Sequence, residues 1–442
     1  MMKEKPLDIW LGTDFEKILI GKLTNAKVTF SDNMDEPVHR WFRFPAGFSA
    51  EFAKFFLQYF LSNKGVVLDP FTGCGTTNVV AKSLGLPSIG VERHPLLAWI
   101  AKVKVRNYDL KILQVAVEDL LKKVKYELQF KDKNLPLIEN KPELLRKCYP
   151  RDTLCELYTI KKVVDEITND EVRDFFMLAL LCILRKVTDV DVGWPYILPK
   201  KKKRTPQPVF QAYKEQLLMM LNDLKLIDYK EGVDAIIHEA DARDMFFIED
   251  NSIDIAFTSP PYLNNYDYAD RTRLELYFLN YVSSWKEITE KIRSKLIVSC
   301  SHQAKEIGLK EGLMPDEEID PEVRDELIKK AEQLRVEKHR HGGKKDYDVM
   351  VVAYFNDMLK AMQEVYRVLK FGAYYGMVLG DSAPYGVHIP TDDYLAKIGK
   401  HVGFRESKIF VLRERGGKWK YLVDKKIRHG VQLRESLILF KK

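Results

Sequence analysis

Cysteine is scarce in this chain, and its distribution excludes the usual covalent and metal-bound scaffolds. The five cysteines are odd in number and include no CxxC pair; they are Cys74, Cys148, Cys155, Cys182 and Cys300. A disulfide framework or a zinc site is therefore not expected, and a reducing cytoplasm is the favoured location. We expect no metal centre.

Long apolar runs are also absent. No stretch approaches the roughly 18 apolar residues of a membrane span, and residues Met1 to Trp10 contain no apolar signal-peptide core. We therefore expect no membrane association. Glutamine is rare, with ten residues among 442, whereas lysine and glutamate are abundant, a balance that favours a thermophilic source.

The chain does contain enough apolar material for a large folded protein. Of its 442 residues, 46% are hydrophobic and 31% are charged, which suits two domains or one domain with insertions. Basic residues number 71 and acidic residues 64, giving a net charge of +7. This mild basic excess is compatible with a polyanionic partner.

A strand, a glycine-rich turn, a helix and a second strand follow one another near the N-terminus. Val66 to Leu68 is the first predicted strand, and residues 69–77 form the turn. A helix to about Leu84 precedes the strand Ser88 to Val91, which ends at Glu92. Such a unit predicts two parallel strands joined by a right-handed crossover.

Further strands and two insertions complete the predicted organisation. Strands are expected at Ala235–His238, Ile253–Phe257, Ala373–Leu379 and Glu435–Phe440. Amphipathic helices dominate residues 108–232, and charge dominates residues 269–348. We therefore divide the chain into 1–107 (cofactor half of a core), 108–232 (helical insertion and possible target-recognition region), 233–268 (catalytic half), 269–348 (charged insertion) and 349–442 (remaining core and basic C-terminal segment).

The segment Thr258-Ser259-Pro260-Pro261-Tyr262 ends one of these strands. Two consecutive prolines cannot donate ladder hydrogen bonds, so the strand must stop there. The result is a stiff loop at the carboxyl edge of a strand, where open α/β sheets bind their ligands. A proline-rich surface turn is the alternative interpretation.

The glycine turn and the acid after the second strand indicate a nucleoside cofactor. Gly73 and Gly75 allow backbone to approach a ligand closely, and Glu92 is placed to accept hydrogen bonds from two ribose hydroxyls. Neither GK[ST] nor GxGxxG is present, so a P-loop or a classical dinucleotide site is not indicated. Asp241 follows the third strand and would accept from an adenine amino group or cap a helix, with the two roles equally favoured.

Four motifs together resemble the S-adenosylmethionine-dependent amino methyltransferases of cytosine and adenine in nucleic acid. These motifs are DPFTGCGTT (69–77), VERHP (91–95), ADARD (240–244) and TSPPY (258–262). The segment RFPAGFS (43–49) is similar to the methionine-side motif of that family, and GDS (380–382) and LRES (433–436) resemble late elements of its N4-cytosine members. The resemblance covers residues of about 36–106, 233–268 and 349–440. In this chain the cofactor motifs precede the catalytic loop, whereas many family members with DPF-type loops have the opposite order.

The resemblance implies an α/β fold, a Rossmann-like class I methyltransferase sheet with helices on both faces plus a mainly helical insertion. It implies S-adenosyl-L-methionine as cofactor and Ser259, Pro260, Pro261 and Tyr262 as the catalytic loop. The expected cofactor-binding residues are Phe44, Pro45, Asp69, Phe71, Thr72, Gly73, Gly75, Thr76, Thr77, Glu92, Asp241 and Ala242. Tyr266, Tyr268 and Arg271 are expected either to line a channel for the target base or to pack the next helix.

Serine before Pro-Pro-Tyr favours the N4 amine of cytosine over the N6 amine of adenine, by resemblance to the family. DNA is the slightly favoured polymer, with structured RNA such as ribosomal RNA as the alternative. A non-catalytic nucleic-acid-binding protein is disfavoured because both specific loops are intact. Three basic tracts are candidate phosphate contacts or solvated loops, namely Lys200–Arg204, Lys338–Lys345 and Arg413–Arg428.

Overall fold

A seven-stranded sheet forms the centre of the molecule in the computed structural model, which describes residues 30–44, 47–61, 64–192, 197–202, 205–230, 232–414 and 432–442. The strand order is β5-β2-β1-β6-β7-β9-β8, with β9 antiparallel to both of its neighbours and the first five strands parallel. The strands are β1 (Val67–Asp69), β2 (Ser88–Val91), β5 (Ala235–His238), β6 (Ile253–Thr258), β7 (Leu369–Gly380), β8 (Glu406–Glu414) and β9 (Arg434–Lys441). The predicted α/β, Rossmann-like sheet is confirmed.

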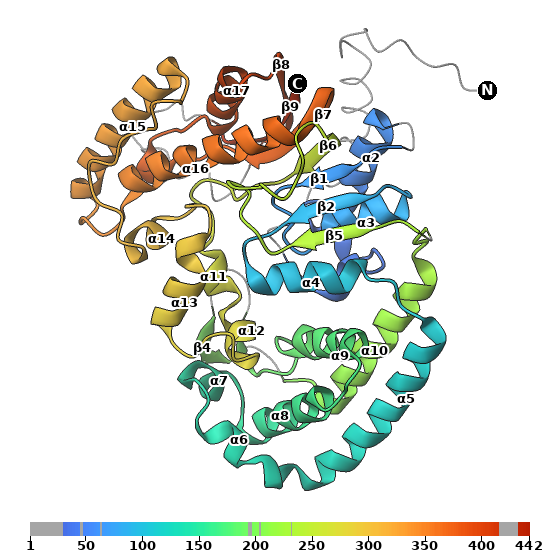
Figure 1. The fold of residues 1–442 in the computed structure, drawn as a ribbon. Helices are drawn as coiled ribbons and strands as arrows, with labels where there is room; N and C mark the ends of the chain where they lie inside the picture. The colour runs from blue at the N-terminus through green and yellow to red at the C-terminus, as the bar shows by residue number, and fades with distance from the viewer. Residues whose placement is uncertain are drawn as a thin grey trace.

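Helices cover both faces of this sheet (Figure 1). On one face lie α2 (Ala50–Phe60) and α3 (Thr76–Ser83), whose apolar side chains pack against Val67, Ile255 and Phe257. The other face is covered by α16 (Tyr347–Val368) and α17 (Thr391–Val402). Alternate residues of each strand therefore enter opposite cores, as expected for strands buried on both sides.

Helix α2 shows how the sequence fixes this packing. Ser49 caps it by accepting a hydrogen bond from the backbone N–H of Phe52 at 3.4 Å. The ring of Phe56 stacks on Phe257 at a centroid distance of 4.3 Å. A Cβ on Gly376 of β7 would come within 2.5 Å of the Phe56 ring, so glycine is required for the helix to lie this close to the sheet.

A mainly helical body extends from the sheet between β2 and β5, and Figure 1 shows it below the core. After α4 (Pro95–Val105) it contains α5 (Leu110–Glu127), α6 (Pro136–Glu139), α7 (Glu143–Cys148), α8 (Arg151–Asp165), α9 (Asp170–Ile183), the hairpin β3 (Val190–Asp191) and β4 (Leu198–Lys202), and α10 (Val209–Leu226). One apolar cluster runs from α4 through α5, α8, α9 and α10 to residues 274–278. The helical body and the core thus share buried surface.

A second group of helices connects β6 to β7. It consists of α11 (Tyr268–Arg271), α12 (Arg273–Phe278), α13 (Trp285–Lys291), α14 (Ser301–Glu306) and α15 (Pro321–Arg340). No helix of the described residues is long and apolar enough to cross a membrane. All five cysteines are free, in agreement with the expectation of no disulfide.

Strand β7 begins at Leu369, directly after α16, and its residues 374–380 pair with 435–441 of β9. The basic tract Lys338–Lys345, interpreted as a phosphate contact or a solvated loop, is helical up to Arg340, where α15 ends, and Lys338 pairs with Asp346 at 2.7 Å. The other two basic tracts fall wholly or largely on residues or side chains outside the described part, as does Pro45.

Candidate active site

Loops from four parallel strands meet at the carboxyl edge of the sheet. The order reverses at β1, which lies between β2 and β6, so the loops after these strands face a common crevice. The crevice is a cavity at the position where open α/β sheets bind their ligands. Eleven predicted site residues line it: Phe44, Phe71, Thr72, Gly73, Thr76, Glu92, Asp241, Ala242, Ser259, Pro261 and Tyr268.

The glycine turn between β1 and α3 forms one wall of this cavity. Gly73 has a φ of +52°, and its backbone N–H donates to Glu92 Oε2 at 2.8 Å. Gly75 has a φ of +89°, and a Cβ there would meet Ala101 Cβ at 3.2 Å. Gly73 therefore shapes the cavity, whereas Gly75 allows the turn to pack on α4.

Glu92 is a buried carboxylate at the end of β2. Its Oε1 accepts from the backbone N–H of His94 at 2.8 Å. Burial raises the pKa of Glu92 to about 7, an effect that the amides of His94 and Gly73 partly offset. A carboxylate that faces a cavity with both oxygens oriented by amides is well suited to accept hydrogen bonds from a diol.

Asp69 and Thr77 are not among the residues that line the cavity, and they support its walls indirectly. Asp69 Oδ1 accepts from the hydroxyl of Thr258 at 2.6 Å and from the N–H of Phe71 at 3.1 Å. Burial raises the pKa of Asp69 to about 6, despite these bonds. Asp69 thus connects the ends of β1 and β6, the two strands that carry the glycine turn and the predicted catalytic loop.

Asp241 is held by a network that reaches across the cavity. Arg243 donates to both Asp241 oxygens at 2.9 and 2.7 Å and to Asp357 of α16 at 2.7 Å. Asp357 in turn accepts from the N–H of Val298 at 3.0 Å. Despite burial, the hydrogen bonds and charge of Arg243 lower the pKa of Asp241, so the carboxylate at the cavity wall stays ionised.

The catalytic loop predicted from Ser259 to Tyr262 follows β6 directly. Ser259 and Pro261 line the cavity, while Pro260 is buried. The hydroxyl of Ser259 lies 3.5 Å from that of Tyr262, which donates to Glu435 Oε1 of β9 at 2.6 Å. Arg413 of β8 completes the chain by donating to Glu435 Oε2 at 2.5 Å. The orientation of Tyr262 is therefore fixed by the far edge of the sheet.

The three residues predicted near the target base are placed differently from one another. Tyr268 lines the cavity and lies 6.4 Å from the Phe44 ring, centroid to centroid. Tyr266 is partly buried and its carbonyl accepts from the hydroxyl of Ser299 at 3.4 Å. Arg271 is buried and lines a second, neighbouring cavity together with Arg185 and Glu275.

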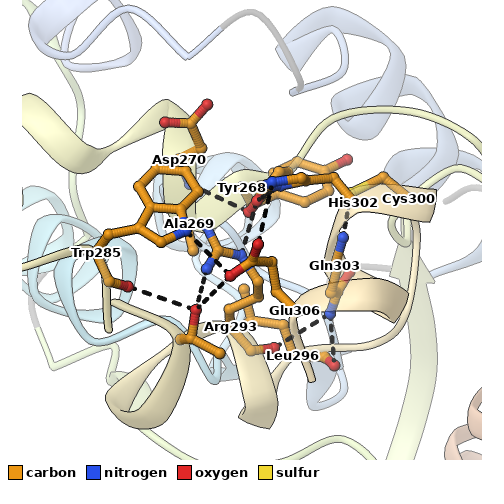
Figure 2. Close-up of polar contacts among 12 residues, drawn as sticks. Tyr268, Ala269, Asp270, Trp285, Arg293, Leu296, Cys300, His302, Gln303 and Glu306 are labelled. Carbon is orange, nitrogen blue, oxygen red and sulfur yellow. Dashed lines mark hydrogen bonds and ion pairs between the residues drawn. The ribbon is translucent and has the colours of Figure 1, made fainter. Parts of the chain in front are cut away.

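A polar network from the second insertion holds α11 and therefore Tyr268 (Figure 2). Asp267 caps α11 by accepting from the N–H of Asp270 at 3.1 Å. The fully buried Arg293 donates to Asp267 at 2.8 Å and lies over the Trp285 ring at 4.5 Å. His302 Nδ1 lies 3.1 Å from the same carboxylate, which raises the pKa of the imidazole.

Sequence reasoning missed the wall formed by Lys295, Leu296 and Ile297. Gln303 orders this wall: its Nε2 donates to the carbonyls of residues 293, 296 and 297 at 3.2, 3.1 and 3.0 Å. Its Oε1 accepts from the N–H of Ser299 at 3.0 Å. The segment lies within a charged insertion, and no local motif distinguishes it.

His94 was also missed, although it stands two residues after Glu92 and lines the cavity. Burial lowers the pKa of His94 to about 4, so its imidazole is neutral near pH 7. Its Nε2 lies 2.8 Å from the hydroxyl of Thr272. Among the described residues, no group of three or more His, Cys, Asp or Glu side chains could hold a metal ion.

Comparison with known proteins agrees with this geometry. A family model described as DNA methylase, for the N6 and N4 amino methyltransferases, matches residues 2–103. Type II methyltransferase M.BsoBI of Geobacillus stearothermophilus is 28% identical over 94% of this chain and 87% of its own length. Type II methyltransferase M.AvaI of Nostoc is 26% identical over 88% of this chain and 84% of its own length. These matches support the assignment of the chain to the S-adenosylmethionine-dependent amino methyltransferases.

The methyltransferase therefore uses S-adenosylmethionine as its cofactor, and its family acts on DNA. The cavity fits that group on two observations. Gly73 offers backbone without a Cβ, and Glu92 presents a carboxylate to the interior. The comparisons give no support to an RNA substrate. Type II methyltransferase M.MjaII of Methanocaldococcus jannaschii is a further relative, 24% identical over 59% of this chain.

Proposed function

We propose that this methyltransferase transfers a methyl group to the exocyclic N4 amine of cytosine in DNA. The observation that carries the proposal is Ser259, a small hydroxyl side chain in front of two prolines, at the wall of the cofactor cavity. When bound, the cofactor would supply an electrophilic methyl group on its sulfonium and leave as the neutral thioether, while the methylated amine would release one proton to solvent. The residues of this chain are proposed to position the two reactants and to stabilise charge that develops during the reaction.

The proposed role of the catalytic loop follows from the weakness of the nucleophile. The lone pair of the cytosine amine is delocalised into the ring. Acceptors that bind the amino hydrogens localise the lone pair on nitrogen, and the Ser259 hydroxyl and the Pro260 carbonyl are those acceptors. Because Pro260 is followed by a second proline, its carbonyl is held rigidly and costs little reorganisation during reaction.

Tyr262 is proposed to stack on the target base. Its hydroxyl is anchored to Glu435 at 2.6 Å, so the ring keeps a single orientation when no base is present. A base in a duplex must first leave the stack, at a cost of a few kcal/mol. Stacking on a ring already held in place offsets part of that cost and aligns the amine with the methyl group.

On the cofactor side, Glu92 is assigned to the ribose hydroxyls and Asp241 to the adenine amine. Supporting this, both carboxylates line the cavity, and hydrogen bonds keep Asp241 ionised. Phe44, Phe71, Thr72, Gly73, Thr76 and Ala242 are assigned to its remaining walls. Asp69, Gly75 and Thr77 are assigned an indirect role, because they position the turn.

The experiment is methylation of a duplex of mixed sequence, followed by digestion and mass spectrometry of the nucleosides. We expect N4-methylcytosine. Ser259→Ala is expected to lower kcat by about 100-fold, the scale of one lost preorganised polar contact, with cofactor affinity unchanged. N6-methyladenine as the product would overturn the base assignment, and full activity of Ser259→Ala would overturn the role of the loop.

A further inference from the structure

A second cavity lies next to the cofactor cavity, and the proposed mechanism leaves it without a role. Its walls come from residues 34–44, the end of α9, β3, and the segment α11–α12. Figure 1 shows α9 and α12 together at the junction of the core and the helical body, where Arg185 and Glu275 are bonded at 2.7 Å.

The charge of this cavity is positive. Five cationic side chains line it, Arg40, Arg43, Arg185, Lys186 and Arg271, against the carboxylates of Asp191 and Glu275.

At least two of the five cations pair with carboxylates within the fold. Arg40 pairs with the buried Asp223, and Arg185 pairs with Glu275 in a bidentate contact at 2.7 and 3.1 Å. Lys186 donates to the neutral amide of Gln216 at 2.8 Å, and no carboxylate of the described residues pairs with it. Arg43 is exposed. Burial lowers the pKa of Arg271 to about 10, and the nearby Arg185 contributes to that shift.

The second cavity adjoins the cofactor cavity through shared and neighbouring residues. Phe44 lines both cavities. Tyr268 and Arg271 stand on the single turn of α11, one facing each cavity. Thr272 lines the second cavity and bonds His94, which lines the first. A ligand bound to Arg271 in the second cavity would therefore lie one helical turn from Tyr268.

We propose that this cavity binds the phosphodiester backbone of the DNA substrate, with Arg43, Lys186 and Arg271 as the phosphate contacts. The inference rests on the proposed function to the extent that the substrate is DNA. Guanidinium groups suit phosphate oxygens because they donate in a planar fork. A bound phosphate would also offset the repulsion between Arg271 and Arg185. The alternative anion is the methionine carboxylate of the cofactor, because Phe44 lines both cavities.

The test measures affinity for a duplex oligonucleotide at several salt concentrations, together with affinity for S-adenosylhomocysteine. Arg43→Ala/Lys186→Ala is the main variant, because both side chains are exposed and their loss should not prevent folding. Arg271→Lys is a second variant, which keeps the positive charge and removes the planar guanidinium group. Lys54→Ala, an exposed change on α2 away from both cavities, is the control.

We expect the double variant to bind DNA about tenfold more weakly, with the slope of log affinity against log salt reduced by about 1 to 2. Cofactor-product affinity should stay within twofold, and the control should match wild type. Unchanged DNA affinity and salt slope would overturn the proposal. Weaker cofactor-product binding with normal DNA binding would overturn it too, and would assign the cavity to the methionine carboxylate.

These outcomes are separate from the identity of the methylated base. If the product were N6-methyladenine, the effect on DNA affinity would still be expected. A wild-type protein that binds no duplex would overturn both proposals.

Discussion

Glu92 should make cofactor binding depend on pH. Its pKa is raised to about 7 by burial, so in the free protein the carboxyl is largely protonated at pH 6 and ionised at pH 8. Ribose hydroxyls donate to the ionised form, so affinity should increase as pH rises through 7, by about tenfold between pH 6 and pH 8. Calorimetric titration with S-adenosylhomocysteine across this range measures the effect.

Glu92→Gln is the matched control for that titration, because it keeps the shape and removes the ionisation. Its affinity should be lower than that of wild type at pH 8 and nearly flat with pH. Asp69, whose pKa is raised to about 6, stays intact in this variant. An equal slope in wild type and Glu92→Gln would therefore assign the pH dependence to another group.

The anchor of Tyr262 is a second feature at the scale of single residues. Glu435→Ala removes the acceptor that holds the tyrosine hydroxyl at 2.6 Å. We expect kcat to fall by about tenfold, or ~1.4 kcal/mol in the barrier, with cofactor affinity unchanged because Glu435 does not line the cavity. Glu414→Ala, an exposed change on the neighbouring strand β8, should behave as wild type in the same assay. A loss of cofactor affinity in Glu435→Ala would contradict the assignment.

Among the elements, the segment from Arg293 to Gln303 links the second insertion to the cavity proposed to bind the cofactor. Gln303→Leu would leave the carbonyls of residues 293, 296 and 297 without the amide that orders them, at a cost of about 1–3 kcal/mol. We expect cofactor affinity to fall by about tenfold, since residues 295–297 form a cavity wall. Gln211→Leu, an exposed substitution on α10, is the control. Lower thermal stability with unchanged cofactor affinity would show that the network supports only the fold.

The elements also show which parts of the site could be predicted from the sequence. Gly73, Glu92, Asp241 and Ser259 each follow a strand within a few residues, and the carboxyl ends of parallel strands meet at one edge, so local signals located them. The wall at Lys295–Ile297 is ordered by Gln303 and by Arg243. The Arg243 side chain donates to the Lys295 carbonyl, although the two residues are 52 positions apart in the sequence. Such long-range pairing leaves no periodic pattern in the sequence. Helix α15 did carry a local signal, Asp320 before Pro321 at its first turn, which the high charge of the region obscured.

On the scale of the whole molecule, the helical body and the α/β core are held together as one unit. Their shared apolar cluster is joined by polar bonds across the boundary. Arg106 at the end of α4 pairs with Asp174 of α9 at 3.1 Å, and Asp223 of α10 accepts from the N–H of Val38 and the indole of Trp41, both at 3.0 Å. Buried contacts of this kind favour cooperative unfolding.

Calorimetry in the presence of the cofactor product can test whether the helical body and the core unfold cooperatively. We expect one thermal transition, which moves upward as a whole when the ligand is added. At 100 times its Kd the ligand stabilises the folded state by about 2.7 kcal/mol. With an unfolding entropy of about 2.1 cal/mol/K per residue, this corresponds to a rise in Tm of about 3 °C for a chain of this length. If the helical body unfolded independently, two transitions would appear and only that of the core, which carries the cofactor loops, would shift.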